Sequence, residues 1–392
     1  MNNKIKLAVA GAVLSAASVA NAGIIIPAGD WTIDINGNVN AYATWIDADK
    51  TKGTAPTGGL AVTRDASGES DTQTMNTGLL PAWLGFTGTT RQNDLDVSFT
   101  ISFQPNVSDN HAHGDVLEPR NRQAFVTFGD ASWGSVKLGK DLGIFAGQAI
   151  LNDMTLLGVG AGAANSGAAT TLGGIGTGYI YPAWKGQIAY TTPNMNGLQA
   201  TVALVNPTQV AGSDTDMYND RLGMEAQVTY DFKAGNTGGK LWVSGASYEV
   251  NGTTGADDFD VSVADIGLTL TNGNLGLTGY YYSGEGAGTT VLGNAGATNG
   301  VERDSDGGYL QATYVIPTGT KLGVAYGVSR LDTVGDEATT LLDENSRWTV
   351  GAYHPLTKHL NLVAEYNQVE SEDHAGASSE SDHISLGAIL FF

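Results

Sequence analysis

The stretch from Ser381 to Phe392 reads SDHISLGAILFF and sets the expectation for the whole fold. Its apolar side chains recur at every second position, at Ile384, Leu386, Ala388, Leu390 and Phe392. A period of two indicates a strand with one apolar and one polar face. A strand that closes a barrel in lipid needs an apolar outer face, and a terminal aromatic ring can lie at the membrane interface. We therefore interpret Phe392 as a barrel-closing terminal signal in an all-β protein.

The same alternation runs through the rest of the chain. In Leu95 to Gln104 the odd positions are apolar and the even ones polar, and Trp31 to Ile46 and Arg221 to Phe232 behave alike. Such segments are typical of strands with one side facing water. The pattern predicts sixteen strands, at residues 31–46, 79–90, 93–104, 120–129, 132–140, 185–193, 196–205, 220–232, 238–250, 258–271, 274–283, 307–316, 319–331, 346–355, 358–370 and 381–392.

Short and long connections alternate between these strands. The short ones carry turn residues, as in PNMNG at 193–197 and NGN at 272–274. The long ones are polar and mostly acidic, at 47–78, 106–119, 141–184, 206–219, 284–306, 332–345 and 371–380. Segregation of loop lengths is typical of a transmembrane β-barrel and not of a soluble all-β protein, which is the alternative. We expect a 16-stranded antiparallel transmembrane β-barrel with both termini on the short-turn, periplasmic side.

The first residues have the three parts of an export signal. Lys4 and Lys6 precede an apolar run from Leu7 to Ala17, and Ala20-Asn21-Ala22 forms a cleavage site of the A-x-A type. The alternative is an ordinary first helix. We expect residues 1–22 to be a signal peptide and residues 23–392 to form the barrel. The chain has no cysteine, so an exported protein of this length must rely on its fold for stability.

Composition narrows the function classes. Two of the 19 basic residues lie in 1–22, so 17 basic against 40 acidic residues leave a mature net charge near −23. Such acidity argues against nucleic acid as a partner. The longest uncharged stretch, Met154 to Trp184, is too rich in Gly, Ser and Thr to form a good membrane-spanning helix.

Two blocks carry a resemblance to a known family. They are NRQAFVTFGDASWGSVKLGKD from Asn121 to Asp141 and YPAWKGQIAYTTPNMNGLQATVAL from Tyr181 to Leu204. With the opening strand and Phe392, they resemble the Gram-negative general porin family. The resemblance implies a homotrimer of sixteen-stranded barrels in the outer membrane. It also implies a third loop folded into each barrel, contact with outer-membrane lipid and lipopolysaccharide, and passage of small hydrophilic solutes and ions.

The third long connection supports an inward loop independently. It begins with a helix-like patch from Leu142 to Leu157 that is rich in large apolar side chains. Exposed on a surface loop, such a patch would be a liability, whereas inside a barrel it can pack on the wall. A surface Ω-loop or a subunit contact remains the alternative.

The resemblance further implies a pore constriction, where loop acids face basic wall residues. The candidates are Asp141 and Asp153 against Arg120, Arg122, Lys137 and Lys140; opposed charges of this kind would orient and select permeants. Two features depart from the family pattern. The loop carries no charge from Met154 to Trp184, and strand parity groups both arginines with Ala124, Val126 and Phe128. The arginines therefore face either the lumen or a subunit interface.

Other constellations offer weaker signals. His111 and His113 with two nearby aspartates suggest a metal, but a second ligand cluster is missing, so we expect no metal and no cofactor. An outer-membrane barrel enzyme would need a nucleophile–histidine pair near the outer rim. His354 and His359 lie at a predicted short turn, and His374 and His383 have no obvious nucleophile. We expect the protein not to be an enzyme.

The sequence thus predicts a passive, water-filled channel, with a substrate-specific porin carrying a saturable sugar or organic-acid site as the alternative. Small outward residues, Ala41 and Ala43, would suit subunit contacts. Acidic residues in the predicted loops favour a mild cation preference, although four basic wall residues could reverse it. Those acids are Asp214, Asp216, Asp220, Asp304, Asp306, Glu370, Glu372, Asp373 and Glu380.

Overall fold

The structure is a computed structural model that describes residues 23–392, apart from 65–66, 106, 108–119, 162–169, 208–216, 219 and 253–256. The side chains of residues 49–50, 217–218 and 252 are also outside this description. Several sequence predictions therefore fall on residues that are not described: the signal peptide, the His111–His113 cluster, and Asp214 and Asp216.

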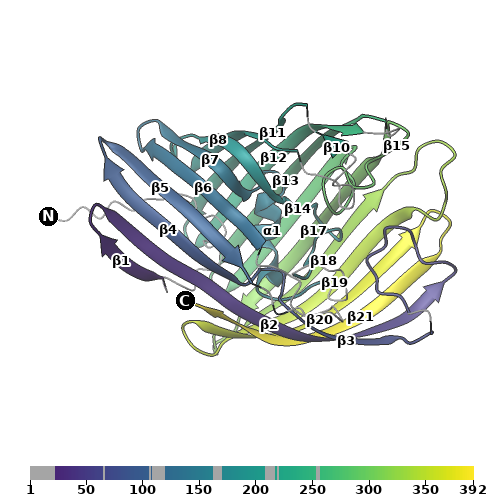
Figure 1. Cartoon of the computed structure of the whole chain (residues 1–392). Coiled ribbons are helices and arrows are strands. Elements are labelled where there is room, and N and C mark those ends of the chain that lie inside the picture. Colours follow the sequence, from purple (N-terminus) through teal and green to yellow (C-terminus); the bar gives the residue numbers. More distant parts are fainter. Residues whose placement is uncertain are drawn as a thin grey trace.

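Within the described residues, sixteen antiparallel strands form a closed barrel (Figure 1). They are β2 (Trp31–Lys52), β4 (Trp83–Gln92), β5 (Leu95–Gln104), β6 (Arg120–Asp130), β7 (Gly134–Leu142), β8 (Trp184–Thr191), β9 (Leu198–Val205), β11 (Gly223–Ala234), β12 (Thr237–Gly252), β13 (Phe259–Asn272), β14 (Leu275–Glu285), β17 (Asp304–Val315), β18 (Lys321–Leu331), β19 (Leu342–Pro355), β20 (Leu360–Asp373) and β21 (Ser378–Phe391). Short strands supplement the wall: β1 (Ile24–Ala28), β3 (Asp71–Asn76), β10 (Met217–Tyr218), β15 (Ala297–Thr298) and β16 (Val301–Glu302).

The barrel closes between β2 and β21, as the last stretch of sequence predicts. Val39 pairs with Leu390, and the pairing continues along both strands toward the long-loop end. At the other end Gly37 and Phe392 exchange backbone hydrogen bonds: the Gly37 N–H donates to the Phe392 carbonyl at 2.8 Å, and the Phe392 N–H donates back at 3.0 Å. A Cβ atom at Gly37 would lie only 2.2 Å from the Trp83 carbonyl oxygen and 2.8 Å from the Phe392 ring, so this close approach of the backbone needs glycine.

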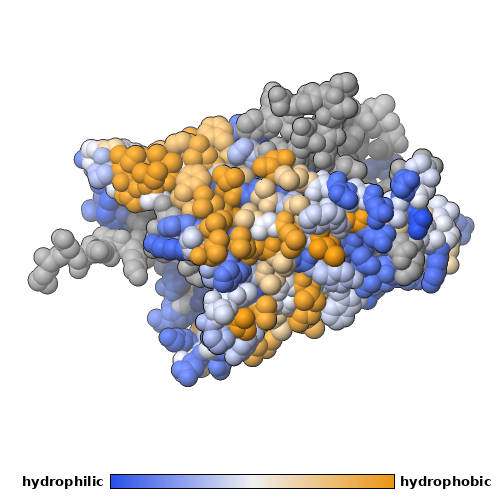
Figure 2. All heavy atoms as spheres, turned by 90° about the horizontal axis from the view of Figure 1, so that it is seen from below, coloured by the Kyte–Doolittle hydropathy of each residue, from blue (hydrophilic) through white to orange (hydrophobic). Residues whose placement is uncertain are grey.

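The predicted alternation becomes the two faces of the wall. On β12, Leu241 and Val243 point outward with 39% and 48% exposure, whereas Trp242 and Ser244 point inward with 1% and 4%. Hydrophobic residues gather over the middle of the outer surface, and hydrophilic ones dominate toward the long-loop end (Figure 2). No helix among the described residues is long and apolar enough to cross a membrane.

All sixteen predicted strands are present, but several run further than predicted at the long-loop end. The predicted links 284–306, 332–345 and 371–380 shrink to 286–303, 332–341 and 374–377. The reason is that backbone pairing can continue beyond the apolar band wherever polar side chains still alternate. The prediction that six acids lie in loops was therefore wrong; they belong to β17, β20 and β21: Asp304, Asp306, Glu370, Glu372, Asp373 and Glu380.

The connection between β7 and β8, residues 143–183, is the third loop, and its described part lies inside the barrel (Figure 1). It contains α1 (Gly147–Asn152) and the 3-10 helix η1 (Met154–Leu157), within the predicted helix-like patch. Phe145, Ala149 and Tyr179 are fully buried, in one cluster with inward residues of the wall. For these residues the surface-loop alternative was wrong, because their apolar side chains pack on the wall.

Candidate functional site

Inward-facing carboxylates of the wall hold the start of the third loop. Glu225 of β11 accepts hydrogen bonds from the backbone N–H groups of Ile144 and Phe145, at 2.6 and 3.1 Å. Asp265 of β13 accepts from the N–H of Ala146 at 3.2 Å. Ionised acceptors form stronger hydrogen bonds than neutral ones. The loop is therefore attached by its backbone, which leaves its side chains free to pack.

The far side of the barrel holds the middle of the loop in the same way. Glu365 of β20 accepts from the N–H groups of Val159 and Gly160, at 3.0 and 2.9 Å. Gln311 of β17 accepts from the N–H of Met154 at 2.8 Å. The loop thus spans the interior from β11 to β20. The sequence did not predict these anchoring acids, which belong to the wall and not to the loop.

Glu225 is almost completely buried, and its charge is compensated locally. Lys185 of β8 donates to it at 2.5 Å, and the Tyr248 hydroxyl donates to the same carboxylate oxygen. A buried ion pair is tolerable only when hydrogen bonds satisfy its remaining atoms. These residues were missed in the sequence, although charged residues in the middle of an otherwise neutral polar strand face were a usable signal.

Asp153 of the loop faces the wall cation Arg347, which the sequence analysis missed. The Tyr179 hydroxyl donates to Asp153 at 2.8 Å, and the Arg347 guanidinium lies 3.7 Å from the same oxygen. Asp153 also accepts from the N–H of Thr155 at 2.8 Å and so caps η1. Asp153 and Arg347 are both buried, so their charges act within the packed loop and not on open water.

Asp141 lies at the end of β7 and not on the loop. Its carboxylate pairs with Lys137, four residues earlier on the same strand, and Gln123 of β6 donates to it at 3.0 Å. Lys137 also lies 4.9 Å from the centre of the Phe125 ring. The predicted acid and base are therefore neighbours along the wall, not partners across a gap.

A β-bulge on β6 breaks the strand parity that groups the two arginines with Ala124. Ser102 pairs with Gln123 but Phe103 pairs with Asn121, so Arg122 is an extra residue. A bulge reverses the alternation of the residues before it. Arg120 accordingly pairs with the inward-facing Gln104 rather than following Ala124 outward.

Two cavities lie on the two sides of the third loop. The loop-side cavity, about 740 Å³, lies between the loop, the ends of β6–β8 and residues of the 53–70 and 286–303 connections. Arg120, Arg122 and Lys140 all line it. The turn-side cavity, about 240 Å³, lies toward the short turns and is lined by Lys137, Asp141, Lys240 and a band of glutamine and threonine side chains. Leu142 and Leu151 line both cavities, so these two side chains lie between them.

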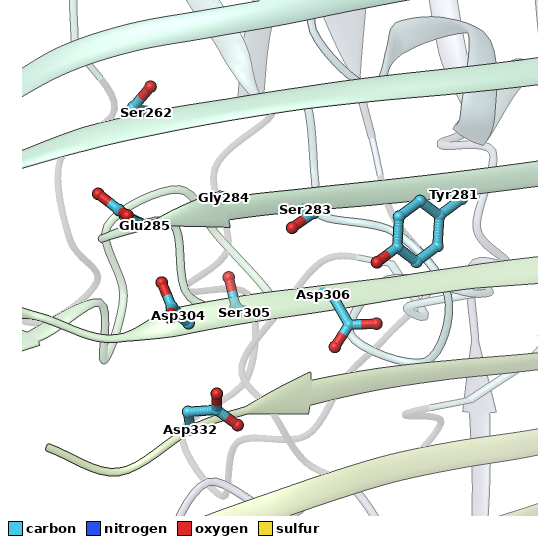
Figure 3. A pocket seen from close by; sticks show the side chains of 9 residues that line it. All are labelled: Ser262, Tyr281, Ser283, Gly284, Glu285, Asp304, Ser305, Asp306 and Asp332. Carbon is cyan, nitrogen blue, oxygen red and sulfur yellow. The ribbon is translucent and has the colours of Figure 1, made fainter.

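A third cavity, about 550 Å³, lies on the outer wall (Figure 3). Its carboxylates, Glu285, Asp304, Asp306 and Asp332, come from β14, β17 and the residue after β18. They share its lining with Tyr281, which is half exposed on the outward face. This acidic surface is therefore separate from the interior.

The histidines include one pairing that the sequence analysis missed. His383 and the Ser381 hydroxyl lie 2.9 Å apart on β21, and both side chains are fully buried. His383 Nδ1 has no hydrogen-bond partner among the described residues, so the pair lacks the carboxylate that would orient a catalytic histidine. Among the described residues, no group of three or more His, Asp or Glu side chains could hold a metal ion.

Comparison with known proteins fits this architecture. A sequence profile of Gram-negative porins matches residues 7–374. The chain belongs to the Gram-negative porin family. Members form channels, and this porin is accordingly a passive channel of the outer membrane. The comparison with curated proteins gave no match.

Solved porin structures share the fold of this porin at low sequence identity. The outer membrane channel DcaP of Acinetobacter baumannii has a TM-score of 0.69 at 16% identity, over 93% of this chain and 99% of that one. An anion-selective porin from Comamonas acidovorans has a TM-score of 0.63 at 15% identity, over 92% and 100%. Salmonella typhi OmpF, in complex with daunomycin, has 0.58 at 13%, over 94% and 100%.

Proposed function

We propose that water and small hydrophilic solutes cross this porin beside β6–β8. The path runs from the loop-side cavity, past Leu142 and Leu151, into the turn-side cavity. The observation that carries the proposal is that these two leucines line both cavities. The predicted constriction residues then lie at two positions along the path. The loop-side cavity is lined by Arg120, Arg122 and Lys140, and the turn-side cavity by Lys137 and Asp141. Asp153 lines neither cavity and instead fixes the loop through Arg347.

Reconstitution in planar bilayers tests this function. Purified protein should give stepwise, ohmic conductance in potassium chloride. Bilayers that stay silent, together with turnover of a hydrolase substrate, would overturn the channel in favour of an enzyme. Non-enzymatic function is part of the proposal, and its support is that the Ser381–His383 pair is buried away from any substrate.

We also infer the sign of ion selectivity. The loop-side cavity is lined by three cations and the turn-side cavity by two, whereas Asp141 is the one acid among the described lining residues. Glu370 and Glu380, which the cation prediction counted at the mouth, lie on the outward strand faces of Tyr366 and Ile384. Fixed charge along the path therefore favours anions, the reverse of the preference predicted from the loops.

A homotrimer in the outer membrane completes the proposal. Its support is the small outward side chains of Ala41 and Ala43 on β2, which suit close packing of a second wall better than contact with lipid. Migration of the unheated protein at monomer mass on a gel would contradict the proposed homotrimer.

The membrane environment is inferred from the outer surface. The hydrophobic area in Figure 2 suits contact with outer-membrane lipid. The polar area toward the long-loop end suits contact with lipopolysaccharide. The short turns and both termini then face the periplasm, and residues 1–22 would be removed on export. Protease added outside intact cells should cut the long connections only; cleavage at the short turns would overturn this orientation.

A further inference from the structure

The loop-side cavity has a lining that differs from the rest of the proposed path. Most of its wall is apolar, with Leu79, Leu80, Ile150 and Ile175 among its residues. The turn-side cavity, by contrast, is lined mainly by neutral polar side chains. Pockets of about 300–1,000 Å³ with an apolar lining and a few polar groups are typical of small-molecule sites. At about 740 Å³ the loop-side cavity falls in this range.

The charged part of its lining has one sign. Arg120, Arg122 and Lys140 line the cavity, and no acidic side chain does so among the described residues. Arg122 is only 8% exposed and has no ion-pair partner in the described part of the chain; its guanidinium lies 5.8 Å from the centre of the Trp184 ring. A buried guanidinium without a counter-charge is costly, and a bound anion would remove that cost.

The apolar and cationic parts belong to the same space. Trp184 lines the cavity together with Arg122, while Leu79 and Ile175 line it from the 77–82 segment and the third loop. A ligand that satisfies both parts needs a negatively charged group at one end and an apolar body at the other. A small inorganic anion would leave the apolar wall uncovered, and a sugar would leave the cations unpaired.

We propose that the loop-side cavity binds small amphipathic carboxylates: an aromatic or short aliphatic body with one carboxylate. The carboxylate accepts hydrogen bonds from Arg122 and from the neighbouring Arg120 or Lys140, because guanidinium and ammonium donors suit carboxylate oxygens. The body packs against the leucines and isoleucines of the lining. This inference rests on the proposed path, since it makes the cavity a saturable binding site along that path.

Block of single-channel current by benzoate tests the inference. Benzoate should reduce the open-channel current in a saturable manner. Acetate, which has the charge without the body, and benzamide, which has the body without the charge, should each block at least about tenfold more weakly. Equal block by benzoate and acetate would overturn the proposal, because it would mean a general effect of anions.

Variants locate the site. Arg122→Gln should weaken benzoate block about tenfold or more, as expected for loss of a charged hydrogen bond. Lys140→Gln provides a second test if the Arg122 variant does not fold. Lys140 is exposed, so its replacement should not disturb folding, and it should also weaken benzoate block. Arg330→Gln, which removes a charge from the outer face, is the matched control and should leave block unchanged. Migration of the unheated protein on a gel reports folding of each variant.

The outcomes separate this inference from the function on which it rests. A conducting channel that benzoate does not block contradicts the carboxylate site and leaves the channel intact. A protein that does not conduct contradicts the proposed path itself. If Lys137→Gln weakens block as much as Arg122→Gln does, benzoate binds on the turn side of the third loop, and the site proposed here is wrong.

Discussion

Glu225 has four hydrogen-bond donors within reach and almost no contact with solvent. Two are backbone N–H groups of the third loop, and the others are Lys185 and Tyr248. Replacing it by Gln would leave the ammonium of Lys185 buried without its counter-charge. Breaking a buried ion pair on one side costs about 3–5 kcal/mol.

We therefore expect Glu225→Gln to lower the free energy of unfolding by about this amount. The urea midpoint of the refolded barrel is the measurement, and channel noise should rise as the loop loses its first attachment. Glu344→Gln is the control, because Glu344 pairs with Arg330 on the exposed outer face, where an ion pair contributes about 0–1 kcal/mol. Equal losses in the two variants would contradict the anchoring role.

A second prediction concerns the pair Arg303 and Glu337, which joins the 286–303 and 332–341 connections. The Arg303 Nε donates to Glu337 at 2.9 Å, and its Nη2 also binds this carboxylate. The hydrogen bond from Arg303 lowers the pKa of Glu337 from its usual 4.5 to about 2. Because the folded pKa is below the unfolded one, the stabilisation is complete above about pH 4.5 and is lost as the pH falls toward 2.

Hydrogen exchange, corrected to intrinsic rates, checks the pH dependence. Protection of the amides in both connections should fall between pH 4.5 and 2, whereas Glu337→Gln should show low protection that hardly changes over this window. Protection that stays constant in the native protein would show that other contacts fix these connections.

At the residue scale, the sequence indicated which types of charged residue line the site but not which of them form ion pairs. Lys137 and Asp141 were predicted to face each other across the pore and are neighbours on one strand. Arg347 was missed because its role depends on its ion pair with Asp153. Asp153 lies beside Arg347 only because the third loop crosses the barrel interior. Partners of this kind depend on loop conformation, which has no periodic signal.

At the scale of elements, the third loop separates two spaces. Leu142 ends β7 and Leu151 lies on α1, and both line the two cavities. Replacing both by Ala would remove side-chain volume at the junction, so we expect a larger single-channel conductance. Leu151 is buried, so its replacement also costs about 2–5 kcal/mol in stability.

Leu156→Ala is the matched control, because Leu156 lies on the same loop and lines the loop-side cavity alone. It should cost similar stability without raising the conductance. If the double variant Leu142→Ala, Leu151→Ala also conducts like the native channel, solutes take another route through the barrel.

Element-scale prediction succeeded for strands because their signal is local. Each of the sixteen predicted segments corresponds to a wall strand, and the errors lie mainly at the long-loop ends, where apolar residues no longer mark the outer face. The bulge at Arg122 escaped prediction since it is set by the register with β5, not by the composition of β6. The loop helices were predicted as a patch, but their route across the lumen depends on Glu225, Asp265 and Glu365.

At the scale of the whole molecule, the sign of the net charge differs from the sign of the charge that lines the proposed path. The chain is strongly acidic, yet the described residues that line the path carry more cations than acids. We expect the zero-current potential across a potassium chloride gradient to show chloride as the favoured ion. The preference should weaken as salt rises, because the Debye length shrinks from roughly 10 Å at 0.1 M.

The variant Lys137→Gln, Lys140→Gln should shift this potential toward zero, while Arg330→Gln on the outer face should leave it unchanged. Potassium as the favoured ion in the native channel would mean that the acidic surfaces at the mouth outweigh the lining.

The exchange of hydrogen bonds between Gly37 and Phe392 has a consequence for how the barrel forms. The two partners stand at opposite ends of the folded chain, so the seam between β2 and β21 is a contact of very high sequence separation. Contacts of this kind form slowly, because almost the whole polypeptide must be ordered first. Until then both strands keep open edges that invite pairing with other chains. Assembly of the wall should therefore end at this seam, and a nascent barrel needs shielding from its neighbours until the seam is made.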